Sequence, residues 1–445
     1  MKVTADLHVH SRFSLAASKS LSPASLDYWA RVKGIGLAGT GDCTHPAWLD
    51  ELRGHLDEAE EGLFTLKRGI RAAFDTSPAA AGIPAPGTGT VPRFVLTGEV
   101  STIYRKGGKT RKVHHLVILP GFTAAAAFQA KLERTGNIRG DGRPTLGIDS
   151  RELLSLLLEA DERSLLVPAH IWTPWFSVLG ARSGFDSIDE CYGDLAPFIP
   201  AVETGLSSNP PMNWAVPSLD RFSIISNSDA HSPEKLGREA TVFEMELSFA
   251  SLAGAIRPGS PGGNTGSILY TLEFFPQEGK YHYDGHRKCG AGLCPEEAGD
   301  GLCPVCGRPL TMGVLRRVTE LAGRPVDERA ACPPNSGGAG GDGTNRRPYV
   351  SLIPLRELIA ELLCTGAASK KTGAAYARLV GQAGSELGLL ADTPLSAIGK
   401  MSAPGIQGGR LAEAVSRMRA GQVVIRPGYD GVYGVVRVFP DGEGL

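Results

Sequence analysis

Histidines and carboxylates recur along the first half of the chain in combinations that suit metal ions. Near the N-terminus, His8 and His10 are two residues apart, so on a strand both side chains project from the same face and can bind one metal. Five further clusters follow, at Asp42-Cys43-Thr44-His45, Gly98-Glu99, His114-His115, His170 and Asp229-Ala230-His231. Imidazole nitrogen and carboxylate oxygen are ligands for zinc, manganese or iron. Together the clusters predict a multinuclear site that activates water and holds a phosphate.

Apolar segments precede nearly all of these clusters and predict the elements that position them. The predicted strands are Val3–Val9, Phe94–Val100, His114–Leu119, Leu165–Ala169, Ala201–Glu203 and Ser223–Ser226. They alternate with amphipathic stretches, which is typical of βα units around a parallel sheet or barrel. Ligands at the carboxyl ends of barrel strands converge on one rim, so we expect the site there. A structural, hydrogen-bonded role is the simpler interpretation of His114 or His45 alone, but six clusters together favour a metal centre.

These motifs resemble the polymerase and histidinol phosphatase (PHP) superfamily, in which a distorted (β/α)7 barrel holds up to three metals and hydrolyses phosphoesters. The resemblance implies one metal bound by His8, His10, Glu99 and Asp229, a second near Asp42, His45 and His231, and a third held by Glu99, His115 and His170. His114 is the alternative to His115. The resemblance also implies catalytic roles for Asp229, Glu99 and His10. Many members carry another histidine shortly after the first pair, and Phe13–Lys19 contains none.

A basic hairpin is predicted between Glu99 and the His114-His115 pair. Gly107-Gly108 marks its turn, and counting back from this turn places Glu99 and His115 nearly opposite each other. The hairpin would carry positive charge about 25 Å from the metals, at about 3.3 Å per residue, on Arg105, Lys106, Lys109, Arg111 and Lys112. The net charge of the chain is −1, so any attraction to nucleic acid must be local. This hairpin could hold a polymer's phosphates, or it could be an ordinary solvated loop.

Four of the eight cysteines lie close together, at Cys289, Cys294, Cys303 and Cys306. The Cys303-Pro-Val-Cys306-Gly knuckle indicates a zinc ribbon, whereas the first half of the motif is looser. We therefore expect these four cysteines to bind a structural Zn²⁺, with His286 as the substitute for Cys294.

The order of these patterns predicts several domains. We expect a barrel over residues 1–278, a zinc-binding module over 279–330, a flexible glycine-rich linker over 331–348 and a mainly helical DNA-binding domain over 349–445. Within the last domain, Ala403–Ala414 resembles a helix-hairpin-helix turn, in which the amides of Gly405 and Gly408 would bind a phosphate. A plain loop between helices is equally consistent with this segment. The 42% hydrophobic composition, with no membrane-length apolar run and no leader-like start, predicts a cytoplasmic protein.

The three-part arrangement resembles the endonuclease Q family over nearly the whole chain. The matching features are the barrel motifs, Tyr281–Arg287 leading into the zinc knuckle, and the tail Arg426–Gly434. The resemblance implies nicking of DNA on the 5′ side of deaminated bases (uracil, hypoxanthine, xanthine) and abasic sites, with Zn²⁺, Mg²⁺ or Mn²⁺ in the barrel. Damaged DNA would be the partner, with a sliding clamp or other repair proteins as further candidates. A small-molecule phosphatase, a proofreading 3′–5′ exonuclease and a non-catalytic DNA-binding scaffold remain as alternatives.

Overall fold

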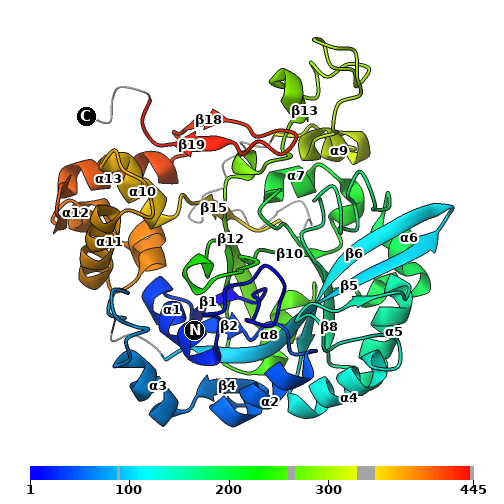
Figure 1. The fold of residues 1–445 in the computed structure, drawn as a ribbon, viewed down its shortest axis with the longest axis horizontal. Helices are drawn as coiled ribbons and strands as arrows, with labels where there is room; N and C mark the ends of the chain where they lie inside the picture. Colours follow the sequence, from blue (N-terminus) through cyan, green and yellow to red (C-terminus); the bar gives the residue numbers. More distant parts are fainter. Residues whose placement is uncertain (88–90, 259–265, 328–345, 441–445) are drawn as a thin grey trace.

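The N-terminal part of the chain forms a distorted α/β barrel (Figure 1), which confirms the fold class predicted from the alternating patterns. The computed structural model describes residues 1–87, 91–258, 266–327 and 346–440. The barrel strands are β1 (Lys2–Asp6), β2 (Leu37–Gly39), β5 (Arg93–Lys106), β6 (Lys109–Leu119), β8 (Leu165–Pro168), β9 (Ala201–Glu203) and β10 (Ser223–Ile225). All six predicted strands are therefore present, with small shifts at their ends.

The barrel is distorted because one strand runs against its neighbours. β1, β2 and β5 are parallel, whereas β6 lies antiparallel between β5 and β8. This inversion follows from the Gly107-Gly108 turn, whose residues adopt φ angles of 60° and 73° as a tight hairpin requires. β9 and β10 are parallel. A β-bridge between Val9 and Ala230 pairs the segment after β10 with the segment after β1.

Aliphatic side chains fill the barrel beneath its carboxyl-terminal rim. Leu7, Leu116, Val167 and Ile225 belong to one buried cluster, and the alternation of side chains along each strand directs their polar neighbours elsewhere. Helices surround the strands: α1 (Pro23–Lys33), α2 (Pro46–His55), α3 (Arg68–Asp75), α4 (Phe122–Leu132), α5 (Ser150–Ala160), α6 (Ile188–Tyr192), α7 (Pro210–Trp214) and α8 (Phe249–Ile256). None of the described helices has the length and apolar character to cross a membrane.

Several strands that extend the sheet were not predicted from the sequence. β11 (Ala240–Glu244) and β12 (Ser267–Glu273) continue the sheet beyond β1, while β3 (Leu56–Glu60) and β4 (Leu63–Leu66) continue it beyond β5. β7 (Thr145–Leu146) pairs with β5. β15 (Tyr349–Ser351) pairs in parallel with β12, so the segment expected to open the C-terminal domain begins as a strand of the barrel's sheet.

The zinc module and the C-terminal region follow the barrel. The module contains β13 (Asp284–His286), β14 (Ala291–Leu293) and α9 (Val314–Leu321). The C-terminal elements are α10 (Leu355–Leu362), α11 (Lys370–Ala383), α12 (Leu395–Ile398), β16 (Ser402–Ala403), β17 (Ile406–Gln407), α13 (Gly408–Arg419), β18 (Val424–Arg426) and β19 (Val435–Arg437). β18 and β19 pair with each other as antiparallel strands. Most of the expected linker, residues 331–345, lies outside the described residues.

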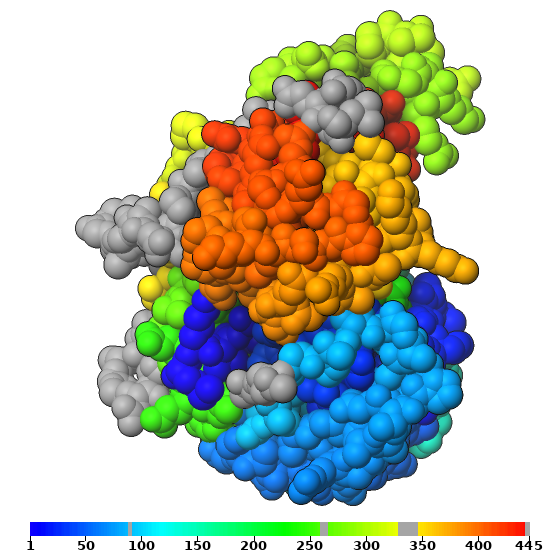
Figure 2. Space-filling view, turned by 90° about the vertical axis from the view of Figure 1, so that its left-hand side faces the viewer, coloured from blue at the N-terminus to red at the C-terminus, as the bar shows by residue number. Residues whose placement is uncertain are grey.

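The C-terminal helices sit directly on the barrel, as Figure 2 shows for the orange helices above the blue N-terminal part. A buried ion pair joins the two parts, with Lys33 Nζ 2.6 Å from Glu386 Oε2 and both side chains less than 10% exposed. Beside this pair is a cavity of about 330 Å³ lined by residues of α1, of the 234–238 loop and of the helical region. The ion pair therefore fixes the helical region against α1.

Candidate metal centre

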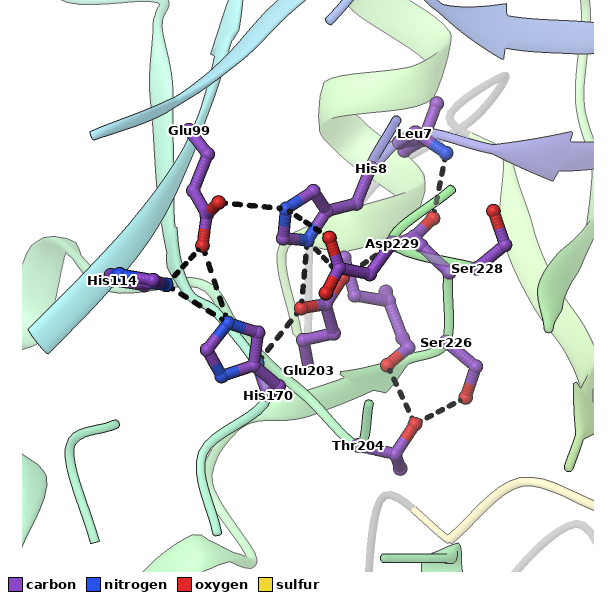
Figure 3. Close-up of polar contacts among 12 residues, drawn as sticks. Leu7, His8, Glu99, His114, His170, Glu203, Thr204, Ser226, Ser228 and Asp229 are labelled. Atoms are coloured by element: carbon purple, nitrogen blue, oxygen red, sulfur yellow. Dashed lines mark hydrogen bonds and ion pairs between the residues drawn. The ribbon is translucent and has the colours of Figure 1, made fainter. Parts of the chain in front are cut away.

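Histidines and carboxylates from distant segments meet where the barrel strands end (Figure 3). Two ligand groups form, each with its ligand atoms within 4.8 Å of one another, and they share Glu99. The first consists of His8, His10, Glu99 and Asp229, and the second of Glu99, His114 and His170. All of these residues are buried except Asp229, whose side chain is 26% exposed. The site is therefore a deep, carboxylate-bridged cluster open to solvent beside Asp229.

Glu99 directs one carboxylate oxygen toward each group. Its Oε1 lies 2.6 Å from His114 Nδ1 and 3.2 Å from His170 Nε2. Its Oε2 lies 3.4 Å from His10 Nε2 and 3.6 Å from His8 Nε2. A carboxylate placed in this way can bridge two metal ions.

The donor set fits metal ions of the zinc or manganese type. His8 Nε2 is buried without a hydrogen-bond partner among the described residues, 3.6 Å from Glu99 and 3.7 Å from Asp229. An unsatisfied imidazole nitrogen facing two carboxylates is an arrangement that a cation satisfies. The four residues of the first group supply two imidazole nitrogens and two carboxylates.

The charges within the cluster keep its carboxylates ionised. Burial opposes ionisation of Glu99, but His114 and His8 outweigh it and hold the pKa of Glu99 well below its usual range. Asp229 is likewise held at a low pKa, because its hydrogen bond from His10 and the charge of His8 outweigh its burial. Burial lowers the pKa of His114 to about 4, whereas Asp229 and Asp42 raise the pKa of His10 to about 10 against the effect of its burial. Metals bind ionised carboxylates and neutral imidazole, so a metal bound at this cluster would displace a proton from His10.

Three of the predicted site residues have left-handed backbones. Asp42, His170 and Asp229 have φ angles of 47°, 31° and 49°. Such conformations are uncommon outside glycine, cost free energy and concentrate at functional sites. Each of these residues lies two to four residues after the end of a barrel strand, where the chain bends at the rim.

The register of the β5–β6 hairpin places His114, rather than His115, beside Glu99. Glu99 is opposite Leu116, and His114 is opposite Ser101, so Glu99 and His114 lie on the same face of the hairpin. His115 lies on the other face, where it contacts the Tyr192 hydroxyl at 2.8 Å and the Thr102 hydroxyl at 3.0 Å. The expectation that His115 faces the metals is therefore corrected in favour of the alternative, His114.

The expected second metal position near Asp42, His45 and His231 is not assembled as a ligand group among the described residues. Asp42 Oδ2 already accepts hydrogen bonds from the Ser11 amide, the Ser11 hydroxyl and the Ser14 hydroxyl, at 2.6–2.9 Å. His45 is the N-cap of α2. Asp42 Oδ1 lies 3.2 Å from His10 Nδ1, so both carboxylate oxygens of Asp42 already have partners, and Gly142 packs against Oδ2. His231 lies at the rim with its ring 4.2 Å from that of His10.

Two residues at the site were not predicted from the sequence. Glu203 is buried, and both of its carboxylate oxygens lie 3.0 Å from His8 Nδ1. Its position at the end of the predicted strand Ala201–Glu203 could have identified it as a site residue, because the other site residues also follow predicted strands. Arg143 Nη1 lies 3.1 Å from Glu99 Oε2, and nothing in the local sequence distinguishes this arginine from its basic neighbours.

The cysteine module forms a separate group of four ligands. His286, Cys289, Cys303 and Cys306 have their ligand atoms within 4.8 Å of one another, and His286 Nδ1 lies 3.3 Å from Cys306 Sγ. Burial would raise the pKa of Cys303, but the Val305 and Cys306 amides lower it to about 6, which favours the metal-binding thiolate. Cys294 lies outside the group. It follows β14, and its carbonyl accepts hydrogen bonds from the Glu297 and Ala298 amides. The arrangement favours the substitute, His286, over Cys294 as the fourth ligand.

The basic hairpin is only partly free to meet a ligand. Arg105 and Lys109 are exposed. Lys106 Nζ donates to the Cys191 carbonyl at 3.1 Å, and Arg111 donates to the Gly184 carbonyl while lying 4.1 Å from the Phe185 ring centre. Lys112 lies 5.2 Å from the ring centre of Phe176. Three of the five basic side chains therefore also hold the hairpin against the segment that follows β8.

The expected helix-hairpin-helix turn, Ala403–Ala414, follows α12 and consists of the β16–β17 turn and the first part of α13. Gly405 occupies the turn with φ of 79°. Gly408 begins α13 and is buried, and a Cβ there would lie 2.4 Å from the carbonyl oxygens of Gly399 and Met401. Close packing against the preceding loop by itself requires glycine at this position.

Comparisons with known proteins agree with this geometry. Residues 221–261 match the family model described as PHP-associated. The chain is 25% identical to YqxK of Bacillus subtilis over 98% of this chain and 99% of YqxK. It is also 30% identical to MJ0043 of Methanocaldococcus jannaschii over 279 residues, a match that spans 60% of this chain and 31% of MJ0043.

Two solved structures match almost the whole chain. The lesion-specific endonuclease PfuEndoQ from Pyrococcus furiosus is 31% identical, with a TM-score of 0.79 and coverage of 99% of this chain and 96% of that chain. Endonuclease Q in complex with a 27-mer duplex carrying an abasic lesion at the active site is also 31% identical, with a TM-score of 0.78 and coverage of 99% and 97%. The barrel, the bridged cluster and the cysteine module thus lie in the same overall fold as these enzymes, and the chain belongs to the endonuclease Q family.

Proposed function

We propose that this protein is a DNA repair endonuclease that hydrolyses the phosphodiester on the 5′ side of deaminated bases (uracil, hypoxanthine, xanthine) and of abasic sites. The observation that carries the proposal is the Glu99-bridged ligand cluster at the barrel rim. Its chemistry suits phosphodiester hydrolysis, and a solved relative of similar fold was captured with an abasic lesion at its active site.

The proposed centre uses six side chains to hold two metal ions. His8, His10 and Asp229 would hold one ion and His114 and His170 the other, with Glu99 between them. Zn²⁺ fits the donor set, with Mg²⁺ or Mn²⁺ as candidates for the catalytic ion. Such ions, when bound, lower the pKa of a water molecule and offset the negative charge of the phosphate. Asp229 has the most exposed side chain of the six and faces the side from which a phosphodiester would enter.

Arg143 is the residue that we propose to hold the phosphate. Its guanidinium pairs with Glu99 and is 26% exposed, so part of it faces solvent at the site. The backbone of the Arg143 loop is fixed, because the Gly142 amide donates to the Phe13 carbonyl at 3.0 Å and the Pro144 carbonyl accepts from Ser101 at 2.9 Å. A fixed guanidinium can donate to the non-bridging oxygens and stabilise the charge that develops on them.

Recognition of the damaged nucleotide would require its extrusion from the base stack. This costs a few kcal/mol, and least where the base is mispaired or missing. We propose that the zinc module and the C-terminal region enclose the extruded nucleotide while the barrel residues act on the adjacent phosphodiester. Arg105 and Lys109 at the hairpin tip, and the amides of Gly405 and Gly408, are the candidate contacts to the DNA backbone.

The test uses end-labelled duplexes that carry a single deoxyuridine, deoxyinosine or abasic site, beside an undamaged duplex of the same sequence. With Mg²⁺, Mn²⁺ or Zn²⁺ present we expect a single product cut 5′ of the lesion. Cleavage at random positions, or digestion from an end, would contradict lesion recognition and favour an exonuclease. Turnover of p-nitrophenyl phosphate without any DNA cleavage would favour a small-molecule phosphatase.

The Asp229→Asn variant tests the barrel's part in the reaction. It should lose nicking while retaining most of its DNA affinity, because Asp229 is proposed to hold metal rather than DNA. Full activity in this variant would remove the cluster from the mechanism. Damaged-DNA binding that is unchanged by metal removal, with no cleavage under any condition, would instead favour a non-catalytic scaffold.

A further inference from the structure

Aromatic side chains from three separate parts of the chain meet on the surface beside the barrel rim. Trp175 comes from the loop after β8, Tyr281 from the start of the zinc module and Tyr433 from the loop between β18 and β19. The rings of Trp175 and Tyr281 have centres 5.4 Å apart at an interplanar angle of 72°. Lys280 links the other pair, with Nζ 5.6 Å from the ring centre of Tyr281 and 5.8 Å from that of Tyr433. We call these four residues the aromatic patch.

Two of the three aromatic rings of the patch are exposed, although exposed rings of this size are uncommon in a cluster. Trp175 is 40% exposed and Tyr433 is 71% exposed. Core packing therefore does not account for Tyr433. An isolated exposed apolar residue is ordinary on a protein surface, but a cluster drawn from three segments indicates a binding surface.

The backbone around the patch is held in place. The Gly434 amide donates to the Glu278 carbonyl at 3.0 Å, and the Val432 amide donates to the Tyr429 carbonyl at 2.7 Å, on either side of Tyr433. The Gly431 amide donates to the Lys280 carbonyl at 2.8 Å. Figure 1 shows the β18–β19 hairpin reaching the zinc module next to β13, where Tyr429 forms a bridge with Tyr283. Hydrogen bonds therefore hold the backbone segments that carry the exposed rings.

The patch is directly connected to the metal centre. The Thr173 hydroxyl donates to the Trp175 carbonyl at 2.9 Å and lies 3.2 Å from Nδ1 of the ligand His170. The next residue, Phe176, has a left-handed backbone with φ of 60°, and its ring centre lies 4.7 Å from that of His114. The loop that presents Trp175 is thus anchored on two proposed metal ligands.

We propose that the aromatic patch binds unpaired nucleobases of the DNA strand, stacking them on Trp175 and Tyr433 next to the site of cleavage. This inference rests on the proposed function, since it supplies the surface that holds the strand once a nucleotide has left the duplex. Every base has a π-face, so stacking on aromatic rings binds bases without requiring a particular sequence. The Lys280 ammonium between the rings adds a positive charge for the neighbouring phosphate. The patch therefore fits an unstacked segment of DNA.

The test uses the full-length protein and an undamaged single-stranded oligonucleotide containing 2-aminopurine, which no repair reaction consumes. Stacking on an aromatic ring should quench 2-aminopurine fluorescence and the fluorescence of Trp175. Trp175→Ala and Tyr433→Ala should each weaken binding about tenfold and reduce the 2-aminopurine quenching. Tyr433→Phe keeps the ring and should bind like the unmodified protein. Phe198→Ala is the matched control, since Phe198 is 58% exposed and lies outside the patch.

Two further measurements separate stacking from other effects. An oligonucleotide with a base-free linker in place of the bases should bind to the unmodified protein about as weakly as the natural oligonucleotide binds to a variant with both Trp175→Ala and Tyr433→Ala. Unchanged thermal midpoints will show that the variants are folded. Equal affinity and quenching in Trp175→Ala, Tyr433→Ala and the unmodified protein would overturn the proposal. If the protein quenches 2-aminopurine but does not nick damaged DNA, the proposal for the aromatic patch would stand and only the proposed function would be wrong.

Discussion

Both carboxylate oxygens of Glu203 lie 3.0 Å from Nδ1 of His8. The same carboxylate accepts the His170 amide at 2.8 Å and the Asn227 side-chain amide at 2.9 Å. When Glu203 accepts the Nδ1–H of His8, the Nε2 lone pair points into the ligand cluster. Glu203 therefore positions ligands from two separate segments of the barrel, in the way that carboxylates behind metal-binding histidines commonly do.

Substitution of this positioning carboxylate should weaken metal binding without unfolding the protein. We expect Glu203→Gln to lower the affinity of the barrel centre for zinc or manganese about 10- to 100-fold, because the amide is a weaker acceptor for Nδ1–H. Competition against a chelator measures this directly, independently of any activity. Glu244→Gln, an exposed position on β11, is the control. Equal metal affinity in all three proteins would show that Glu203 has no such role.

Removal of the Arg143 guanidinium should affect the rate of nicking more than the binding of DNA. We expect Arg143→Ala to lower kcat about 100-fold, the size of effect seen when a preorganised donor to a reacting group is lost. Arg139→Ala in the same loop, where the side chain is 67% exposed and pairs with Glu133, should retain its rate. A loss of DNA affinity in Arg143→Ala with an unchanged kcat would assign the residue to binding alone.

The two adjacent histidines of β6 should respond differently to the same substitution. His114→Gln is expected to lose one metal of the barrel centre, since His114 faces Glu99. His115→Gln should keep both metals but lose about 1–3 kcal/mol of stability, because the buried Tyr192 and Thr102 hydroxyls lose their partner. Metal content and urea unfolding distinguish the two outcomes. Loss of metal in His115→Gln alone would reverse the assignment.

The cysteine module offers a similar paired test. Cys289→Ser should release the structural zinc, whereas Cys294→Ser should retain it, because Cys294 lies outside the ligand group. Zinc content after gel filtration through a chelating buffer measures both. Loss of zinc from Cys294→Ser to the same extent as from Cys289→Ser would restore Cys294 as the fourth ligand in place of His286.

The Lys33–Glu386 pair should make the attachment of the helical region sensitive to acid. Burial opposes ionisation of Glu386, but Lys33 and the Tyr376 hydroxyl outweigh it and lower its pKa in the folded protein. A carboxyl with a lowered folded pKa stabilises the fold above its unfolded pKa of about 4.3, and this contribution is lost as the pH falls through the folded pKa.

Accordingly, Glu386→Gln should cost about 3 kcal/mol at pH 7, because it leaves Lys33 buried without its counter-charge. The difference from the unmodified protein should shrink below pH 4. Urea unfolding at both pH values measures this, with the exposed Glu152→Gln as the control. A difference that does not depend on pH would mean that the charge of Glu386 is not the stabilising feature.

Features with local causes could be predicted from the sequence. The His8–His10 spacing, the polar residues that follow apolar strands, the Gly107-Gly108 turn and the Cys303–Cys306 knuckle depend on neighbouring residues and backbone geometry. These patterns correctly predicted the barrel, and they include most of the side chains that the structure brings together at its rim. They also predicted that a hairpin joins Glu99 to the paired histidines.

Only the tertiary structure decided between residues that are equivalent in type. One step of strand register separates His114 from His115 and turns their side chains to opposite faces. The fourth ligand of the cysteine group depends on how β13 and β14 fold back on the knuckle, which brings in His286 and leaves out Cys294. Glu203 and Arg143 reach the site, and the loop at Gly142 closes over Asp42, through contacts between segments far apart in the chain. Such contacts follow from the packing of the whole barrel, so no local pattern encodes them.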